Sequence, residues 1–202
     1  MSNSENSLLF RIDYGHIIEK DKNIPSRPQS SGGKRIIYKQ ENLEEMYKRL
    51  LGKAIEEYNA KQSRPDRKKK LAKVMLSPKS FREVTIRIKS ENTVAADFSE
   101  IAKSAFDDYA RSFEERNPCL KIFYAEMLVD EAPLLRIDFI PICHGHSRGL
   151  STAVSFKGAL KEQGCYPVNK SLTEQIMWAY KERSHIESLI NQRRKKNKVE
   201  RG

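Results

Sequence analysis

The sequence lacks the residues and runs on which several protein classes depend. It has only three cysteines, Cys119, Cys143 and Cys165, without CxxC spacing, which excludes a disulfide framework and predicts reduced thiols. No apolar run approaches the ~20 residues that span a bilayer, and no basic segment followed by an apolar stretch opens the chain. We therefore expect a cytoplasmic protein with no membrane partner.

Common catalytic signatures are also missing. The chain contains no GxGxxG and no GxxxxGK followed by Ser or Thr, so the common dinucleotide and P-loop motifs are excluded. Of the four histidines, only His144 and His146 lie close together, beside Cys143. Because a structural zinc site usually needs four ligands, we interpret this CHGH segment as a surface loop and expect no cofactor.

Positive charge is what the sequence has in excess. Its 202 residues carry 38 Lys and Arg against 27 Asp and Glu, a formal net charge of +11. A chain of this length can form one domain with a sizeable core and an extension. Excess positive charge bears on partners, not on fold. Nucleic acid is the favoured polyanion, with an anionic membrane surface as its rival.

Hydrophobic periodicity predicts the elements. Alternation indicates strands over residues 7–14, 82–88, 120–129 and 134–142, and stripes of helical spacing indicate helices over 43–60 and 94–115. Further helices are expected at 155–164 and from 171 onward. This order predicts an α+β fold, an antiparallel sheet with helices packed on one face. We expect one domain over 1–170 and a basic helical C-terminal extension over 171–202.

Three basic segments stand out. The loop 20–35 contains Arg27, Lys34 and Arg35, and is either a flexible connection or a basic flap over phosphates. The run 61–73 holds seven basic residues and one acid, and is either a solvated linker or a phosphate contact. The tail at 193–196 can add non-specific affinity.

The strand at 134–142 has an unusual polar side. Leu135, Ile137 and Phe139 alternate with Leu134, Arg136 and Asp138, so the arginine and the aspartate point the same way. This polar side is either a working site or the solvated face of a sheet.

Several segments together resemble one family. They are AIEEYNAKQSRPDRK (54–68), FEERNPCLKIFYAEMLVDEAPLLRIDFIPI (113–142) and RGLSTAVSFKGALKEQG (148–164), with DYG at 13–15. The combination is similar to the N-terminal relaxase domain of the Mob/Pre plasmid mobilisation and recombination proteins, in the His-hydrophobic-His endonuclease class. The likeness spans most of residues 8–165.

The resemblance implies an antiparallel sheet on which three histidines bind manganese or magnesium, and a tyrosine or histidine that attacks the scissile phosphate. In this chain the three ligand positions fall on Leu128, Leu134 and Arg136, and a loop histidine falls on Arg27. The resemblance therefore implies a relaxase-like pseudoenzyme that binds DNA, either single-stranded or at a plasmid origin, without nicking it. The residues expected to contact phosphate are Arg27, Lys34, Arg35, Arg64, Arg67, Lys68, Lys69, Lys70, Arg136 and Arg148.

Two alternatives stay open. In the first, the chain is an active DNA strand transferase with a rearranged site. Tyr14 or Tyr38 would then be the nucleophile, and Asp130, Glu131 and Asp138 would bind magnesium or manganese. In the second, it is a decayed fragment or structural partner that pairs with an intact relaxase or with itself.

Overall fold

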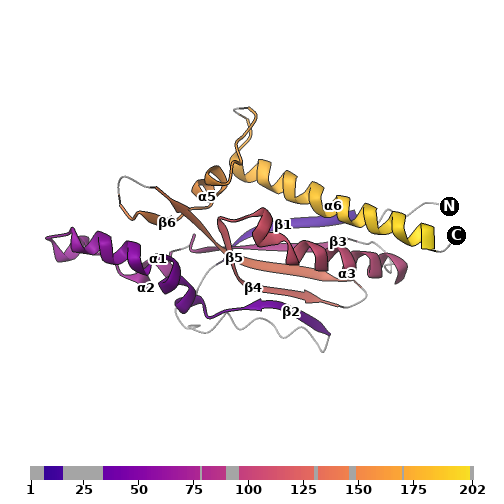
Figure 1. Cartoon of the computed structure of the whole chain (residues 1–202), viewed down its shortest axis with the longest axis horizontal. Helices are drawn as coiled ribbons and strands as arrows, with labels where there is room; N and C mark the ends of the chain where they lie inside the picture. The colour runs from indigo at the N-terminus through magenta and orange to yellow at the C-terminus, as the bar shows by residue number, and fades with distance from the viewer. Residues whose placement is uncertain are drawn as a thin grey trace.

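The fold is built on one antiparallel sheet. The computed structural model of the chain describes residues 7–15, 34–77, 79–89, 96–129, 132–145, 149–169 and 171–200. Five strands follow the order β1-β3-β5-β4-β2, and β6 pairs with the far end of β5. Every pairing is antiparallel, and helices pack on the sheet (Figure 1). The predicted α+β class is confirmed.

The two central strands form the expected hairpin. β4 (Leu120–Leu128) and β5 (Leu134–His144) pair along their length, from Leu120 opposite Pro141 to Leu128 opposite Leu134. The outer strands are β1 (Ser7–Gly15), β3 (Phe81–Lys89), β2 (Arg35–Gln40) and the short β6 (Thr152–Val154). The polar side of β5 is therefore flanked by β3 and β4 in the middle of the sheet.

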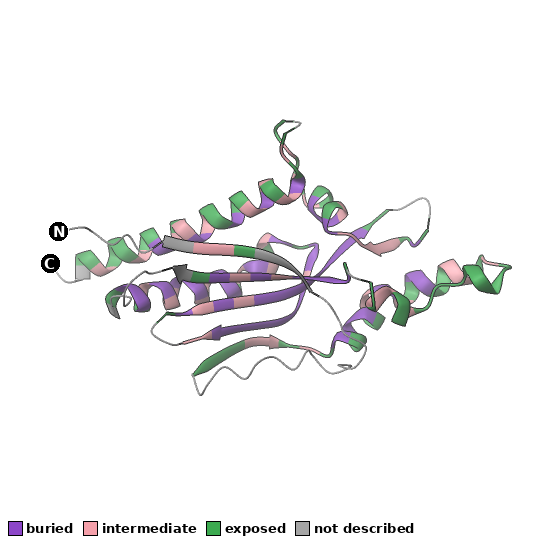
Figure 2. Ribbon diagram, turned by 180° about the vertical axis from the view of Figure 1, so that it is seen from behind, coloured by how far each residue is buried: buried purple, intermediate pink, exposed green. Residues whose placement is uncertain are grey.

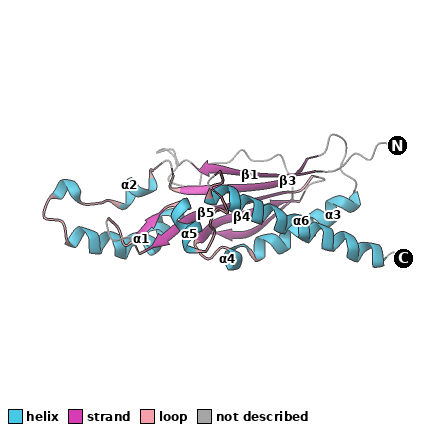
Figure 3. Ribbon diagram, turned by 90° about the horizontal axis from the view of Figure 1, so that it is seen from above, coloured by secondary structure: helices cyan, strands magenta, loops and turns pink. Residues whose placement is uncertain are grey.

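Two long helices cover one face of this sheet. α3 (Ala96–Arg111) and α6 (Glu174–Glu200) lie side by side on it (Figures 1 and 3). Apolar side chains of both pack against the inward residues of β3, β4 and β5. The centre is aromatic: the ring centroid of Trp178 lies 5.2–6.4 Å from those of Phe113, Phe139 and Phe156. α4 (Phe113–Arg116) and α5 (Phe156–Glu162) supply two of these rings.

A second, smaller core forms around α1 (Leu43–Ala60). Asn42 caps this helix by accepting a hydrogen bond from the Glu45 amide. α1 buries Tyr47 and Leu51 against Ile140 and other sheet residues. Ile140 follows Phe139 directly, so consecutive residues of β5 serve the two cores from opposite faces. α1 is followed by η1 (Pro65–Arg67) and by α2 (Leu71–Met75), whose apolar side chains pack back against this core. The end of α1 and η1 project from the sheet (Figure 3).

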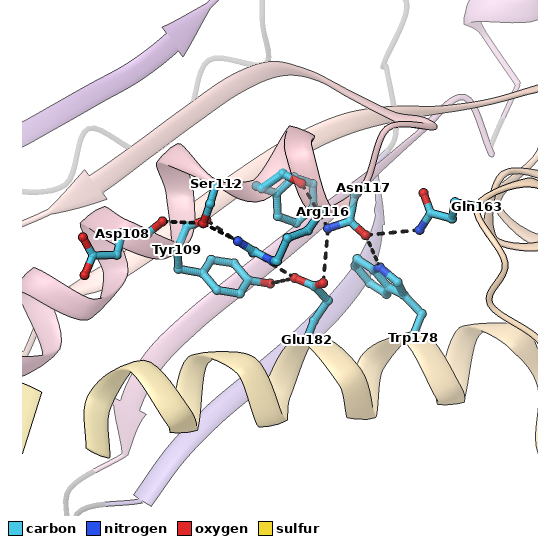
Figure 4. A network of polar contacts seen from close by, with 9 residues as sticks. Asp108, Tyr109, Ser112, Arg116, Asn117, Gln163, Trp178 and Glu182 are labelled. Atoms are coloured by element: carbon cyan, nitrogen blue, oxygen red, sulfur yellow. Dashed lines mark hydrogen bonds and ion pairs between the residues drawn. The ribbon is translucent and has the colours of Figure 1, made fainter. Parts of the chain in front are cut away.

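A buried polar network fixes α6 to the rest of the domain (Figure 4). Glu182, only 1% exposed, accepts hydrogen bonds from Tyr109 at 2.6 Å, Arg116 at 3.1 Å and Asn117 at 3.2 Å. Asn117 in turn accepts a 2.7 Å bond from the indole N–H of Trp178. The C-terminal extension is thus helical, and its first half belongs to the main core.

The structure corrects several predicted boundaries. Of the residues of β2, the predicted loop includes only Arg35, and no element is predicted for 36–40. The structure shows a strand there, whose β-bulge between Ile37 and Lys39 breaks the alternation. The helix predicted over 94–115 is two helices, interrupted at Ser112, whose hydroxyl donates to the Asp108 carbonyl at 2.6 Å. Within the described residues, no helix is both long and apolar enough to cross a membrane.

Candidate nucleic-acid interface and the polar face of the sheet

A polar surface occupies the side of the sheet opposite α3 and α6. We call it the polar face and define it by Arg35, Glu83, Thr85, Tyr124, Glu126, Arg136 and Asp138. Register places them together: Asp138 lies opposite both Glu83 and Tyr124, and Arg136 lies opposite both Thr85 and Glu126. The alternation of residues in β5 predicted a polar side of that strand. The structure shows that residues of four strands contribute to this polar face.

The positive charge on the polar face is neutralised. Arg136 forms ion pairs with Glu83 on β3 and with Asp138, whose Oδ1 lies 3.3 Å from the arginine Nε. Asp138 is 1% exposed, while Arg136 and Glu83 side chains are each 22% exposed. Arg136 is therefore engaged by carboxylates on two sides, which weakens its predicted role as a phosphate contact.

A second group of charges lies beside the first. The Tyr124 hydroxyl donates to Glu126 at 2.8 Å, and Arg35 of β2 lies 3.7 Å from the same carboxylate. Arg35 is thus a strand residue and not part of a flexible loop. Glu83 and Glu126 were not singled out from the sequence, although both follow the strand alternation that would have placed them here.

The three positions that the resemblance assigns to metal ligands come together on this face. Leu128 lies opposite Leu134, and Arg136 follows Leu134 by two residues on the same side of β5. Leucine offers no ligand atom, and a guanidinium repels a cation. No cluster of three His, Cys, Asp or Glu side chains suitable for a metal occurs among the described residues. The residues present do not fit a divalent ion.

Tyr38, one of the two tyrosines proposed as nucleophiles, lies away from the carboxylates of the polar face. Tyr38 packs against the main core, on the α3 side of the sheet, with the Arg111 guanidinium 5.6 Å from its ring centroid. Burial, and then the charge of Asp107, raise the pKa of Tyr38 well above its ordinary value. A nucleophilic tyrosine needs the opposite shift. Tyr14 lies in β1 opposite Arg82, but its side chain is outside the described residues.

Several predicted residues fall outside the described part of the chain. These are Arg27, Asp130, Glu131, His146 and Arg148. The roles proposed for them stay predictions.

The CHGH segment contains a contact that does not involve metal. His144 reaches Glu162 of α5 twice, through its Nδ1 at 2.8 Å from Oε1 and through its backbone N–H at 2.7 Å from Oε2. Burial raises the pKa of the Cys143 thiol, which disfavours the thiolate that binds metals. The surface loop predicted for this segment is wrong for its first two residues, since the buried Cys143 and the exposed His144 end strand β5 and pair with β6. The contact with Glu162 joins β5 to α5.

An exposed basic surface lies on the segment that links α1 to α2 and on the start of α2. We call residues 61–73 the basic arm. Its seven basic side chains are all exposed: Lys61, Arg64, Arg67, Lys68, Lys69, Lys70 and Lys73 (Figure 2). Among the described residues, none of the ion pairs involves any of them. The five arm residues that the sequence predicted therefore share one uncompensated surface.

The arm is held in a defined shape. Asn59 closes it by donating to the Lys69 carbonyl at 2.9 Å and accepting from the Lys69 amide at 2.8 Å. At the tip, the Arg67 and Lys68 amides donate to the Arg64 and Pro65 carbonyls, each at 3.2 Å. The clamp by Asn59 was not predicted, although Asn59 lies inside the YNAKQ segment of the resemblance.

Other predicted basic residues differ in their surroundings. Lys34 is exposed beside β2. In the C-terminal tail, Arg193 forms an ion pair with Asp108 of α3, and Arg194 lies 4.6 Å from the centroid of the Phe98 ring. The tail thus uses part of its charge to pack on α3, in contrast to the basic arm.

Comparison with protein-family models, curated protein sequences and solved structures found no match to this chain.

Proposed function

We propose that this chain is a cytoplasmic DNA-binding protein of plasmid mobilisation or recombination, with a relaxase-like fold and without metal-dependent nicking activity. One observation carries the proposal. Leu128, Leu134 and Arg136, the positions to which the resemblance assigns metal ligands, are neighbours on one sheet face and include no ligand. Their proximity supports the resemblance, and their identity argues against a metal.

The chemistry of Arg136 supports loss of nicking. A metal ion polarises a scissile phosphate as a Lewis acid and can bind an attacking or leaving oxygen. A guanidinium supplies a permanent charge and hydrogen bonds, but no open coordination position. Here that charge is already paired with Glu83 and Asp138. Neither the two leucines nor this guanidinium can take over the role of the ion.

DNA binding is supported by charge. The net charge of +11 favours a polyanionic partner, and the basic arm presents unpaired cationic side chains to solvent. Pairing with an intact relaxase or with a second copy of the chain stays a prediction.

The test combines cleavage and binding. Supercoiled plasmid carrying the DNA that flanks the gene is incubated with the protein in manganese and, separately, in EDTA. Products are scored for nicked circles with covalently attached protein, and the same protein is assayed for a DNA mobility shift. Fluorescence of the buried Trp178 verifies folding.

We expect a mobility shift and no nicking under either condition. Manganese-dependent nicking with a covalent adduct would overturn the proposed loss of activity. The Tyr38→Phe and Tyr14→Phe variants would then identify the nucleophile. A folded protein that shifts no DNA would overturn the proposal altogether.

A further inference from the structure

The basic arm carries a run of positive charges that no carboxylate of the described residues pairs with. Its seven basic residues face one acid, Asp66, and form no ion pair within the described residues. By contrast, Arg136 is paired twice on the polar face, and Arg193 is paired on α3. The arm is therefore a dense group of uncompensated positive charges, which attracts a polyanion.

The arm offers no platform for unpaired bases. Residues 61–73 contain no aromatic side chain. The nearest, Tyr58, is half-buried, and the ammonium group of Lys69 covers it, 5.4 Å from the ring centroid. Proteins that bind single strands without sequence preference stack bases on exposed aromatic rings. A surface with cations and no such ring fits the backbone of a duplex, where charge is densest.

The amide side chains that could read base edges are engaged within the arm. Asn59 uses both its oxygen and its nitrogen on Lys69, and Gln62 points back to the Tyr58 carbonyl at 3.5 Å. The Asn59 clamp instead sets the spacing of the cations around it. Because the arm is ordered before it binds, less conformational freedom is lost on contact with DNA.

We infer that the basic arm is the principal duplex-DNA contact of this protein, gripping phosphates of both strands from a scaffold that Asn59 holds in shape. The inference rests on the proposed DNA binding, and it names the surface and the form of DNA. The polar face makes no phosphate contact in this arrangement.

The first experiment measures the salt dependence of duplex binding. Each phosphate contact on B-DNA contributes about 0.9 to the slope of log K against log salt. A fourfold variant, Arg64→Gln, Arg67→Gln, Lys68→Gln and Lys70→Gln, removes four arm charges and leaves the Asn59–Lys69 clamp intact. Between 50 and 200 mM salt, wild type should lose roughly 150-fold more affinity than this variant.

A matched control removes the same charge elsewhere. The variant Lys181→Gln, Arg183→Gln, Lys195→Gln and Lys198→Gln changes four exposed residues of α6 and gives the same net charge. We expect the slope of log K against log salt for this variant to differ from the wild-type slope by about one or less. An equal fall in slope for both variants would overturn the inference, because overall charge and not the arm would then govern binding.

A third variant tests the scaffold. Asn59→Ala keeps every charge but removes both hydrogen bonds to Lys69. Asn59 is a positioning residue, so its loss should increase the disorder of the free arm and weaken duplex binding by about tenfold. The slope of log K against log salt should not change, because every charge is kept. Undiminished affinity would show that the clamp does not matter for binding.

The form of DNA is tested by competition between a 30-base-pair duplex and a single strand of the same sequence at equal phosphate concentration. We expect the duplex to compete more effectively. Preference for the single strand would overturn the inference while leaving the proposed DNA binding intact. Failure of the folded protein to bind either would overturn both.

Discussion

The buried carboxylate of Glu182 should make a large contribution to stability. Glu182 accepts hydrogen bonds from Tyr109, Arg116 and Asn117 and is 1% exposed. In Glu182→Ala all three donors lose this acceptor, and the guanidinium of Arg116 loses its buried counter-ion. Removing one partner of such a buried network costs about 3–5 kcal/mol. For a chain of this size, that corresponds to a fall in Tm of roughly 6–20 °C.

The measurement is urea unfolding followed by Trp178 fluorescence and, independently, by circular dichroism. Trp178 is the single tryptophan, is 1% exposed and belongs to the same network. Its fluorescence therefore reports on the packing of α6 against the core. Glu182→Gln should fall between wild type and Glu182→Ala. Its amide oxygen still accepts, but its amide nitrogen cannot accept from Tyr109 or Arg116.

The control lies on the same helix. Glu187 forms an exposed i, i+4 pair with Arg183 at 2.8 Å, and its side chain is 45% exposed. Glu187→Ala should cost about 0.5 kcal/mol or less. If Glu182→Ala cost no more than Glu187→Ala, the network would not be what holds α6 in the core.

Two further predictions concern packing and pH. Gly158→Ala should destabilise by about 1–3 kcal/mol, since a Cβ there would meet the Cys143 Sγ at 2.7 Å. Gly52→Ala, where the nearest atom would be a Lys48 carbon at 3.9 Å, should stabilise α1 by about 0.5–1 kcal/mol. Chemical denaturation measures the free energy of unfolding of both variants, and equal changes in the two would contradict this reasoning. The pKa of His185 is lowered, first by burial and then by the charge of Arg116, while Glu182 opposes the shift. The unfolded chain therefore takes up the proton first, near pH 6.5, and stability should fall as pH decreases below that value. In His185→Gln the free energy of unfolding should fall less steeply with decreasing pH. The same pH dependence in this variant and in wild type would refute the prediction.

Elements with clear periodicity could be predicted from the sequence. The helix at α1 and the β4–β5 hairpin have strict patterns, because each buries one face throughout. β2 escaped prediction because its exposed Ile37 and its bulge break the alternation. The interruption of the helix at Ser112 could not be predicted either, since the apolar stripe continues past it to Phe113.

The candidate site was predicted in part. Alternation placed Arg136 and Asp138 on one face, but their neutralisation depends on Glu83, which is 53 residues from Arg136 along the chain and adjacent only through the sheet register. For the basic arm, composition predicted the charge, but not whether distant carboxylates would compensate it. The arm lacks compensating carboxylates because the α1–α2 segment projects away from the sheet (Figure 1).

The salt bridges of Arg136 also couple substitutions at this position to those at its two carboxylate partners. Replacing Arg136 alone, by histidine or by any neutral residue, removes the guanidinium from between Glu83 and Asp138 and leaves two neighbouring carboxylates to repel each other. The cost of a substitution at Arg136 therefore depends on whether Glu83 and Asp138 are still present. The three residues should behave as one coupled unit, in which the effects of single changes do not add.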